Sequence, residues 1–150
     1  MRIDIIVKGD KETKAKLNRL GKSIYNLKNA MELIGRDSAR YFSNQGFSSQ
    51  GGVFGSPWPP LSTRTLTSKN KSYPGRPPLV RTGQMQNSFE FNASSSSVVI
   101  GNTSPHFKYH QSTLPRRKLP RRPTMGINDP IRRIITEHIH NEIRKKIASA

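Results

Sequence analysis

A regular apolar stripe near the amino terminus constrains the fold more than any other feature of the sequence. Large aliphatic residues recur at spacings of 3, 4, 3, 4 and 3, at Leu17, Leu20, Ile24, Leu27, Met31 and Ile34. This spacing is typical of an amphipathic helix that buries one face. Because Tyr41 and Phe42 extend the pattern, we predict a helix over 11–45 that lies on a sheet, in preference to a coiled coil between copies.

The predicted helix is too long for a compact domain. Thirty-five helical residues would span about 50 Å, whereas a domain of this size has a radius of gyration of about 15 Å. We therefore expect the helix to bend at Gly21 or Gly35, or to project beyond the core. The segment "RIDIIVK" (2–8), which precedes it, is predicted to form a short strand.

The middle of the chain is rich in chain-breaking residues. Twelve glycines and prolines lie in 46–83, which predicts a long loop with a short helix at "STRTLTSK", capped by Ser62. A second short helix is expected in "GQMQNSF", capped by Thr82. The segments "SFEFNA" (88–93) and "SVVIGN" (97–102) then predict a hairpin.

The carboxyl-terminal segment has the clearest helical pattern. Asp129 is predicted as its N-cap and Pro130 as its first residue, and the apolar stripe consists of Ile131, Ile134, Ile135, Ile139, Ile143 and Ile147. The order of elements indicates an α+β fold, in which a long N-terminal helix and a C-terminal helix pack on a small, mainly antiparallel sheet. We expect one domain over 1–150, divided into a strand and long helix (1–45), an extended loop (46–83), strands and a basic segment (84–128), and a helix (129–150).

Charge is distributed unevenly along the chain. The net charge is +17, and all nine acids lie in 4–37, at Glu90 or in 129–142, so the middle of the chain is positive throughout. The segment "LPRRKLPRRP" (114–123), called the basic strap below, holds five cations and three prolines. Such a surface favours a polyanion or an acidic protein. With only 32% hydrophobic residues, the core is thin, and we expect burial to be completed against partners.

The sequence offers little support for catalysis. There is no cysteine, and the two long segments without acids leave few carboxylates for metal-assisted hydrolysis. His106 is expected in a loop or strand, His138 in a core or interface, and His140 in solvent. We therefore predict no enzyme activity, no catalytic residue, no metal site and no cofactor. The absence of a long apolar run predicts no membrane span.

Non-specific nucleic-acid binding is the alternative function that the charge supports. Lysine and arginine side chains release counterions from DNA. Aromatic residues interleave with the cations, as stacking on single strands would require, at Trp58, Tyr73, Phe107 and Tyr109. A small, basic, non-specific nucleic-acid-binding protein therefore remains an open alternative.

Five short segments occur in an order that resembles a known family. They are "WPPLSTRTL" (58–66), "PPLVRTGQMQNSF" (77–89), "VVIGN" (98–102), "YHQ" (109–111) and "RPTMGI" (122–127). They are similar to boxes of the phage virion morphogenesis family, the Mu-type tail-completion proteins. The chain departs from the family pattern where "STLPRRK" (112–118) replaces the usual glycine after His-Gln.

The resemblance implies a structural virion protein of the phage neck, which completes the tail and joins it to the DNA-filled head. Such proteins act as rings, commonly of six subunits, and have no catalytic site. The implied partners are other copies of the chain, a connector or stopper protein, and a tail-tube or tail-terminator protein, with non-specific contact to transiting DNA. The protein would be made in the cytoplasm of a bacterial host and reside in the virion.

Two groups of residues are predicted to matter for this role. Contacts with a neighbouring subunit or connector are expected from Trp58, Leu61, Arg116, Arg117, Lys118, Arg121 and Arg122. In the basic strap the prolines keep the chain extended, so its arginines would fork onto carboxylates of the partner. Trp58 is equally well explained as a core anchor for the loop. Gly83 and Gly126 are predicted as structural turns.

Overall fold

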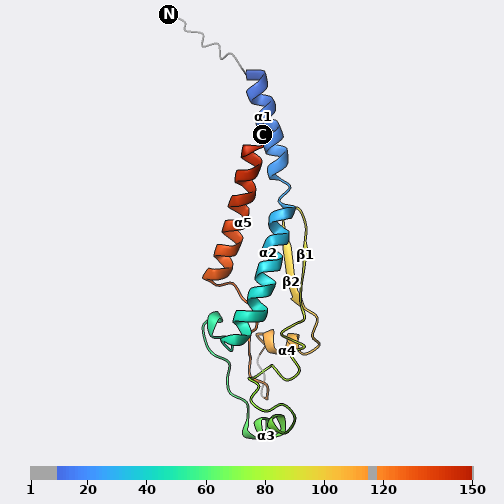
Figure 1. The fold of residues 1–150 in the computed structure, drawn as a ribbon, viewed down its shortest axis with the longest axis vertical. Coiled ribbons are helices and arrows are strands. Elements are labelled where there is room, and N and C mark those ends of the chain that lie inside the picture. Colours follow the sequence, from blue (N-terminus) through green and yellow to red (C-terminus); the bar gives the residue numbers. More distant parts are fainter. Residues whose placement is uncertain (1–9, 115–117, 150) are drawn as a thin grey trace, which may run out of the picture.

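The computed structural model describes residues 10–114 and 118–149. The molecule is elongated, with three parts along its length (Figure 1). A helix projects at one end, a layer of two helices and a hairpin forms the middle, and the loop region folds into a lobe at the other end. The predicted α+β class is confirmed. The predicted strand over 2–8 lies outside the described residues.

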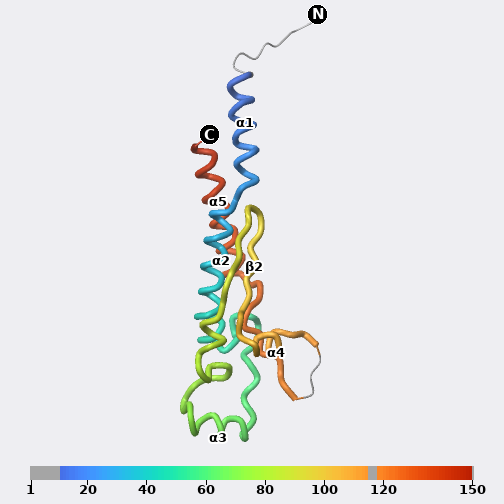
Figure 2. Tube along the Cα trace, turned by 90° about the vertical axis from the view of Figure 1, so that its right-hand side faces the viewer, coloured from blue at the N-terminus to red at the C-terminus, as the bar shows by residue number. Residues whose placement is uncertain are grey.

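The N-terminal helix is broken into two. Helix α1 runs over Asp10–Ile24 and helix α2 over Lys28–Tyr41, and a π-helical turn, Phe42–Gly46, continues α2. At the break, the Leu27 amide donates to the carbonyl oxygen of Ser95 at 2.7 Å. The predicted bend at Gly21 or Gly35 is therefore wrong, whereas the expected projection is confirmed, because α1 extends beyond the rest of the fold (Figures 1 and 2).

Gly35 allows helix α2 to pack closely against the hairpin and does not bend the helix. A Cβ at this position would overlap the Phe91 ring, which lies directly against the helix. Helix α2 therefore approaches the hairpin closely, and its stripe residues Met31 and Ile34 are buried. Leu17, on the α1 half of the same stripe, is 61% exposed. The stripe is thus buried on α2, whereas Leu17 on the projecting α1 stays exposed.

The predicted hairpin is confirmed. Strands β1 (Phe89–Ala93) and β2 (Val98–Asn102) are antiparallel, with Phe91 opposite Ile100. The serine turn is closed by the Ser97 amide, which donates to Ser94 Oγ at 3.0 Å. Hydroxyl side chains that accept from a nearby amide stabilise such turns.

Helix α5 (Asp129–Ala148) packs against α2, which lies between α5 and the hairpin (Figure 1). The C-terminal helix therefore packs on a helix and not on the sheet as predicted. Its N-cap is Asn128, whose Oδ1 accepts from the Ile131 amide at 3.1 Å, so the predicted cap at Asp129 is wrong. His138 is half-buried and contacts Asp37 Oδ2 at 2.8 Å through Nε2, which places it at the α2–α5 interface.

The lobe has its own small core. Phe47, Trp58 and Met85 are buried together, with Leu79, Val80 and Phe89 packed around them. A short 3-10 turn, Gly52–Phe54, and helix α3 (Thr63–Ser72) lie in the loop. The Ser62 cap is confirmed, because its side chain accepts from the Thr65 amide. The loop therefore does not cross the lobe as unstructured chain.

Two local predictions for the lobe are wrong. Residues 84–87 form turns instead of a helix and Phe89 already belongs to β1, although Thr82 Oγ1 does accept from the Gln84 amide at 3.3 Å. Conversely, a short helix, α4 (Phe107–Gln111), occupies the segment after His106 that was predicted as loop or strand. Among the helices of residues 10–114 and 118–149, none has the length and apolar character needed to cross a membrane.

Candidate functional site

Two of the sequence boxes are held together by side chains that bind backbone carbonyls. The indole Nε1 of Trp58 donates to the Pro123 carbonyl oxygen at 2.7 Å. In return, the Arg122 guanidinium donates to the carbonyl oxygens of Pro59 and Pro60, at 2.8 Å and 2.9 Å. The Trp-Pro-Pro segment and the end of the basic strap are thus linked reciprocally.

The Gln111 side chain links a third box, "YHQ" (109–111), to the backbone that follows Pro123. Its Oε1 accepts from the backbone amides of Thr124 and Met125, at 3.1 Å and 3.4 Å, and its Nε2 donates to the Met125 carbonyl at 2.7 Å. A primary amide has both donors and an acceptor, so it can pair with extended backbone as another strand would. The end of α4 therefore fixes the path of the chain leading to α5.

Two cations of the lobe are buried and form hydrogen bonds inside it. Arg122 is 3% exposed and Lys69 is 8% exposed. The Lys69 Nζ donates to the carbonyl oxygens of Arg76, at 2.8 Å, and Pro77. Burial lowers the pKa of both side chains, and nearby Arg76 lowers that of Lys69 further. These groups close loops within the lobe and do not present charge to a partner.

The predicted contact residues therefore separate into different environments. Trp58 is 5% exposed and Arg122 is buried, so both are internal anchors and not exposed contact residues. Lys118 and Arg121 are exposed, and Arg121 Nε donates to the Gln111 carbonyl at 3.4 Å. Leu61 is half-buried. Arg116 and Arg117 lie outside the described residues.

The two predicted turn glycines also differ. Gly83 has a φ of 82°, in the left-handed region that favours glycine, and its carbonyl accepts from the Asn87 amide at 3.0 Å. Gly126 lies in a segment without a turn, has no positive φ, and packs against the Phe54 ring. For Gly126 the structure therefore shows a packing position and not a turn.

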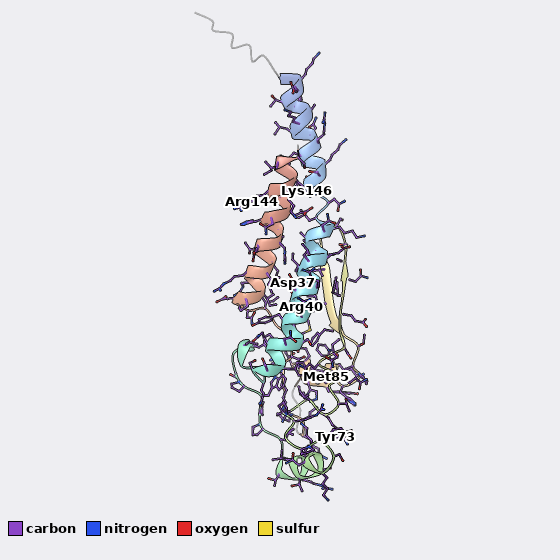
Figure 3. All side chains as sticks on the ribbon, viewed as in Figure 1. Asp37, Arg40, Tyr73, Met85, Arg144 and Lys146 are labelled. Atoms are coloured by element: carbon purple, nitrogen blue, oxygen red, sulfur yellow. The ribbon has the colours of Figure 1, made fainter. Side chains whose placement is uncertain are left out.

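A pocket opens in the lobe, and residues of three of the boxes contribute to its lining. Its lining combines apolar and basic side chains from α3, the following loop, the turns after Gly83 and the region of α4: Leu61, Arg64, Thr65, Ser68, Lys69, Leu79, Arg81, Met85, His106 and His110. The Arg81 guanidinium lies 5.3 Å from the centre of the Tyr73 ring (Figure 3 labels Tyr73 and Met85). No carboxylate is among the lining residues, so this pocket suits an apolar side chain accompanied by negative charge.

The backbone beside the pocket is strained at Leu79. This residue has a φ of 63°, which an L-residue other than glycine or asparagine rarely adopts. Such strain persists only where the surrounding structure enforces it, and it often accompanies binding sites. Here Leu79 packs against the core of Phe47, Trp58 and Met85 and also lines the pocket.

The whole lobe is positively charged, like the lining of the pocket. Every described acid lies on α1, α2, β1 or α5, and none lies in 46–88 or 103–128. The lobe's exposed cations are Arg64, Lys71, Arg76, Arg81, Lys108, Lys118 and Arg121. One end of an elongated molecule is therefore purely cationic, and such an end attracts an acidic surface over several ångströms.

The model of the phage virion morphogenesis family matches residues 9–144. The chain belongs to this family. The resemblance seen in the five boxes is thereby confirmed. No significant match was found to a curated protein or to a solved structure.

Family membership makes the protein a component for phage virion structure and assembly. This family is a structural and assembly family and not one known for enzymes. Within the part of the chain that the structure describes, no cluster of three or more histidine or acidic residues is arranged to hold a metal ion.

Sequence reasoning missed several residues that shape the site. Lys69 and Gln111 were not singled out, nor was Asn102, whose Nδ2 donates to the Met85 carbonyl at 2.7 Å. The boxes contained a signal for two of them, because Gln111 ends the "YHQ" box and Asn102 ends "VVIGN". A polar residue that ends a family box is a candidate for a side-chain bond to another box.

Proposed function

We propose that this protein is a structural component of the phage neck, which completes the tail and joins it to the DNA-filled head as part of an oligomeric ring. The family resemblance implies a ring, and we propose that it contains six copies of the chain. The observation that carries the joining role is the purely cationic lobe with its pocket at one end of the molecule. A joining protein needs such a dedicated end for an unlike partner.

The chemistry of the lobe suggests the partner. The lining of the pocket brings Arg64 and Arg81 together with the apolar side chains of Leu61 and Leu79. Arginine pairs with carboxylates through two parallel hydrogen bonds, and apolar side chains add burial. The proposed partner is therefore an acidic surface on a connector or stopper protein, or on a tail-tube or tail-terminator protein.

Protein is preferred to DNA as the main partner of this lobe. Two of its cations, Lys69 and Arg122, are engaged by carbonyl oxygens and cannot meet phosphates. The pocket is concave and partly apolar, whereas a phosphate backbone is best bound by exposed cations along a track. Non-specific contact with transiting DNA is retained as a lesser role for the exposed cations.

Electron microscopy of lysates tests this proposal. A phage with the gene deleted is expected to give DNA-filled heads beside unattached tails, and the wild-type gene should restore joining. The combined variant Arg64→Glu and Arg81→Glu should fail to restore it, because both arginines of the pocket are reversed in charge. Arg144→Glu on α5 is a matched control, since Arg144 is exposed on the other part of the molecule (Figure 3). Intact particles from the deleted phage would overturn the joining role.

A binding assay separates the alternative. A small nucleic-acid-binding protein would bind DNA as a purified chain, with an affinity that falls steeply with salt. If the protein has the joining role, we expect it to bind DNA weakly. The affinity for DNA should fall little when the charges of Arg64 and Arg81 are reversed. Strong, salt-dependent DNA binding together with normal particles from the deleted phage would establish the alternative instead.

A further inference from the structure

A groove runs between strand β1 and helix α2 and shares no lining residue with the pocket of the lobe. Its walls come from the exposed side of α2 and from the strand: Lys28, Glu32, Leu33 and Arg36, with Phe91, Asn92 and Ala93. Phe91 is 39% exposed although its ring lies against Gly35. A large aromatic side chain is therefore left half uncovered at the base of the groove.

The strand edge beside this groove has no strand partner in the described chain. Within residues 10–114 and 118–149, the sheet consists of β1 and β2 alone. In an antiparallel pair, alternate residues of each strand direct their N–H and C=O groups away from the partner strand. An open edge of this kind is a template for another strand, and a groove beside it adds side-chain contacts.

The sequence contains a segment with the pattern of such a strand. In "RIDIIVK" (2–8), Ile3, Ile5 and Val7 alternate with Arg2, Asp4, Ile6 and Lys8. Paired with β1, the first set would cover Phe91 and Leu33 in the groove. The second set would bring Arg2 or Lys8 beside Glu90, the only acid between residues 38 and 128.

This segment cannot lie along the groove of its own chain over its whole length. Helix α1 has 15 residues, so Asp10 lies about 22 Å beyond the end of α1 near the hairpin turn. Both views show α1 projecting away from the hairpin (Figures 1 and 2). From Asp10 to Ile5 the extended chain spans at most about 18 Å. Ile5 would therefore not reach the hairpin turn, and it would lie still farther from Phe91.

We propose that residues 2–8 of one copy pair with strand β1 of a second copy and fill the groove between β1 and α2. This inference deepens the proposed function, because it names a contact between the copies of the ring. The projecting α1 would then act as the arm that carries the segment to its neighbour. Such a contact is heterologous, because the groove of each copy receives the segment of another, and repeated contacts of this kind form a ring when the rotation between copies closes.

Disulfide trapping between co-expressed chains tests the pairing directly. The sequence has no cysteine, so introduced cysteines are the only ones present. A tagged chain with Ile6→Cys should form a disulfide with an untagged chain that carries either Glu90→Cys or Asn92→Cys, because these two positions cover neighbouring registers on the outer face. Ser48→Cys, which is exposed outside the groove, is the matched control. No disulfide with either strand position, or equal trapping by Ser48→Cys, would overturn the pairing.

The mass in solution provides the second test. Deletion of residues 2–8 should reduce the oligomer to the 16.9 kDa scale of a single chain in light scattering, with an unchanged circular dichroism spectrum per residue. Ile5→Pro should have the same effect because proline cannot donate to a ladder, whereas Ile5→Val should not. An oligomer that survives the deletion would overturn this contact while leaving the joining role, which the lysate experiment decides separately.

Discussion

Trp58 and Pro123 are 65 positions apart and are joined by a hydrogen bond of 2.7 Å between the indole Nε1 and the proline carbonyl oxygen. The indole also meets the Phe47 ring edge-on, with 5.4 Å between ring centres, and the backbone amide of Trp58 donates to the Gln50 carbonyl at 2.7 Å. The Trp58 side chain thus joins Phe47, just after the π-helical turn, to the basic strap, and its backbone amide ties it to Gln50. The stability of the lobe should depend strongly on this side chain.

Substitution of Gly51 should expose this dependence. Gly51 has a φ of 82°, and a Cβ there would overlap the Trp58 indole. Gly75 has a φ of 70° with open space around it, so Gly75→Ala is a matched control for the cost of the left-handed backbone alone. We expect Gly75→Ala to lower the free energy of unfolding by about 1 kcal/mol and Gly51→Ala by at least about 2 kcal/mol more. Urea denaturation followed by circular dichroism measures both, and equal losses would mean that the indole does not pack on Gly51.

Substitution of the two adjacent arginines of the strap should destabilise the protein to very different extents. Arg122→Met removes the donors that hold the Pro59 and Pro60 carbonyls, and we expect a loss of about 2 kcal/mol in unfolding free energy. Arg121→Met removes one long hydrogen bond from an exposed side chain and should cost less than about 0.5 kcal/mol. The same denaturation experiment compares them. Equal effects would show that Arg122 is not an internal anchor.

The strap illustrates what the sequence could and could not predict. Its charge correctly indicated a cationic surface, but composition does not show which arginine is buried. In extended chain, successive side chains point to opposite sides, so Arg121 faces solvent while Arg122 enters the lobe. The direction is set by the carbonyls of Pro59 and Pro60, more than 60 positions earlier, and no local pattern contains that information.

The same distinction between local and distant causes holds for the fold. The hairpin and the Ser62 cap were predictable because alternation and capping involve residues within a few positions. The break between α1 and α2 was not predictable, because Leu27 is held by Ser95 at the hairpin turn. The glycines suggested a bend, yet Gly35 is required by the Phe91 ring and Gly21 has open space around it.

Gln111→Glu should make the stability of the lobe depend on pH. The side chain keeps its acceptor but loses the donor to the Met125 carbonyl, and a carboxylate beside that carbonyl is repelled. We expect a loss of about 1–3 kcal/mol at neutral pH. The loss should shrink as the pH falls, because the protonated carboxyl can again donate.

The exposed Gln84 provides the control for this variant. Gln84→Glu adds the same charge without a carbonyl partner for the lost amide donor. Its stability relative to the wild type should change little over the same pH range. If the two variants lost stability in parallel, the Gln111 side chain would not hold the Met125 backbone.

Asp37 should give the protein a stability that is lost in acid. The hydrogen bond from Arg36 lowers the pKa of this carboxyl, burial opposes the shift, and the hydrogen bond to His138 lowers the pKa further. A carboxyl with a lowered folded-state pKa stabilises the fold at pH values above its unfolded pKa, near 4, and this contribution disappears as the pH falls through the folded-state pKa.

The free energy of unfolding of the wild type should therefore exceed that of Asp37→Asn at pH 6, and the difference should shrink below about pH 4. Urea denaturation from pH 6 to pH 3 measures it, with Glu12→Gln as the control for the loss of one exposed carboxylate. Because Asp37 lies on α2 and His138 on α5, a difference that stayed constant down to pH 3 would mean that this pair does not stabilise the interface between the two helices.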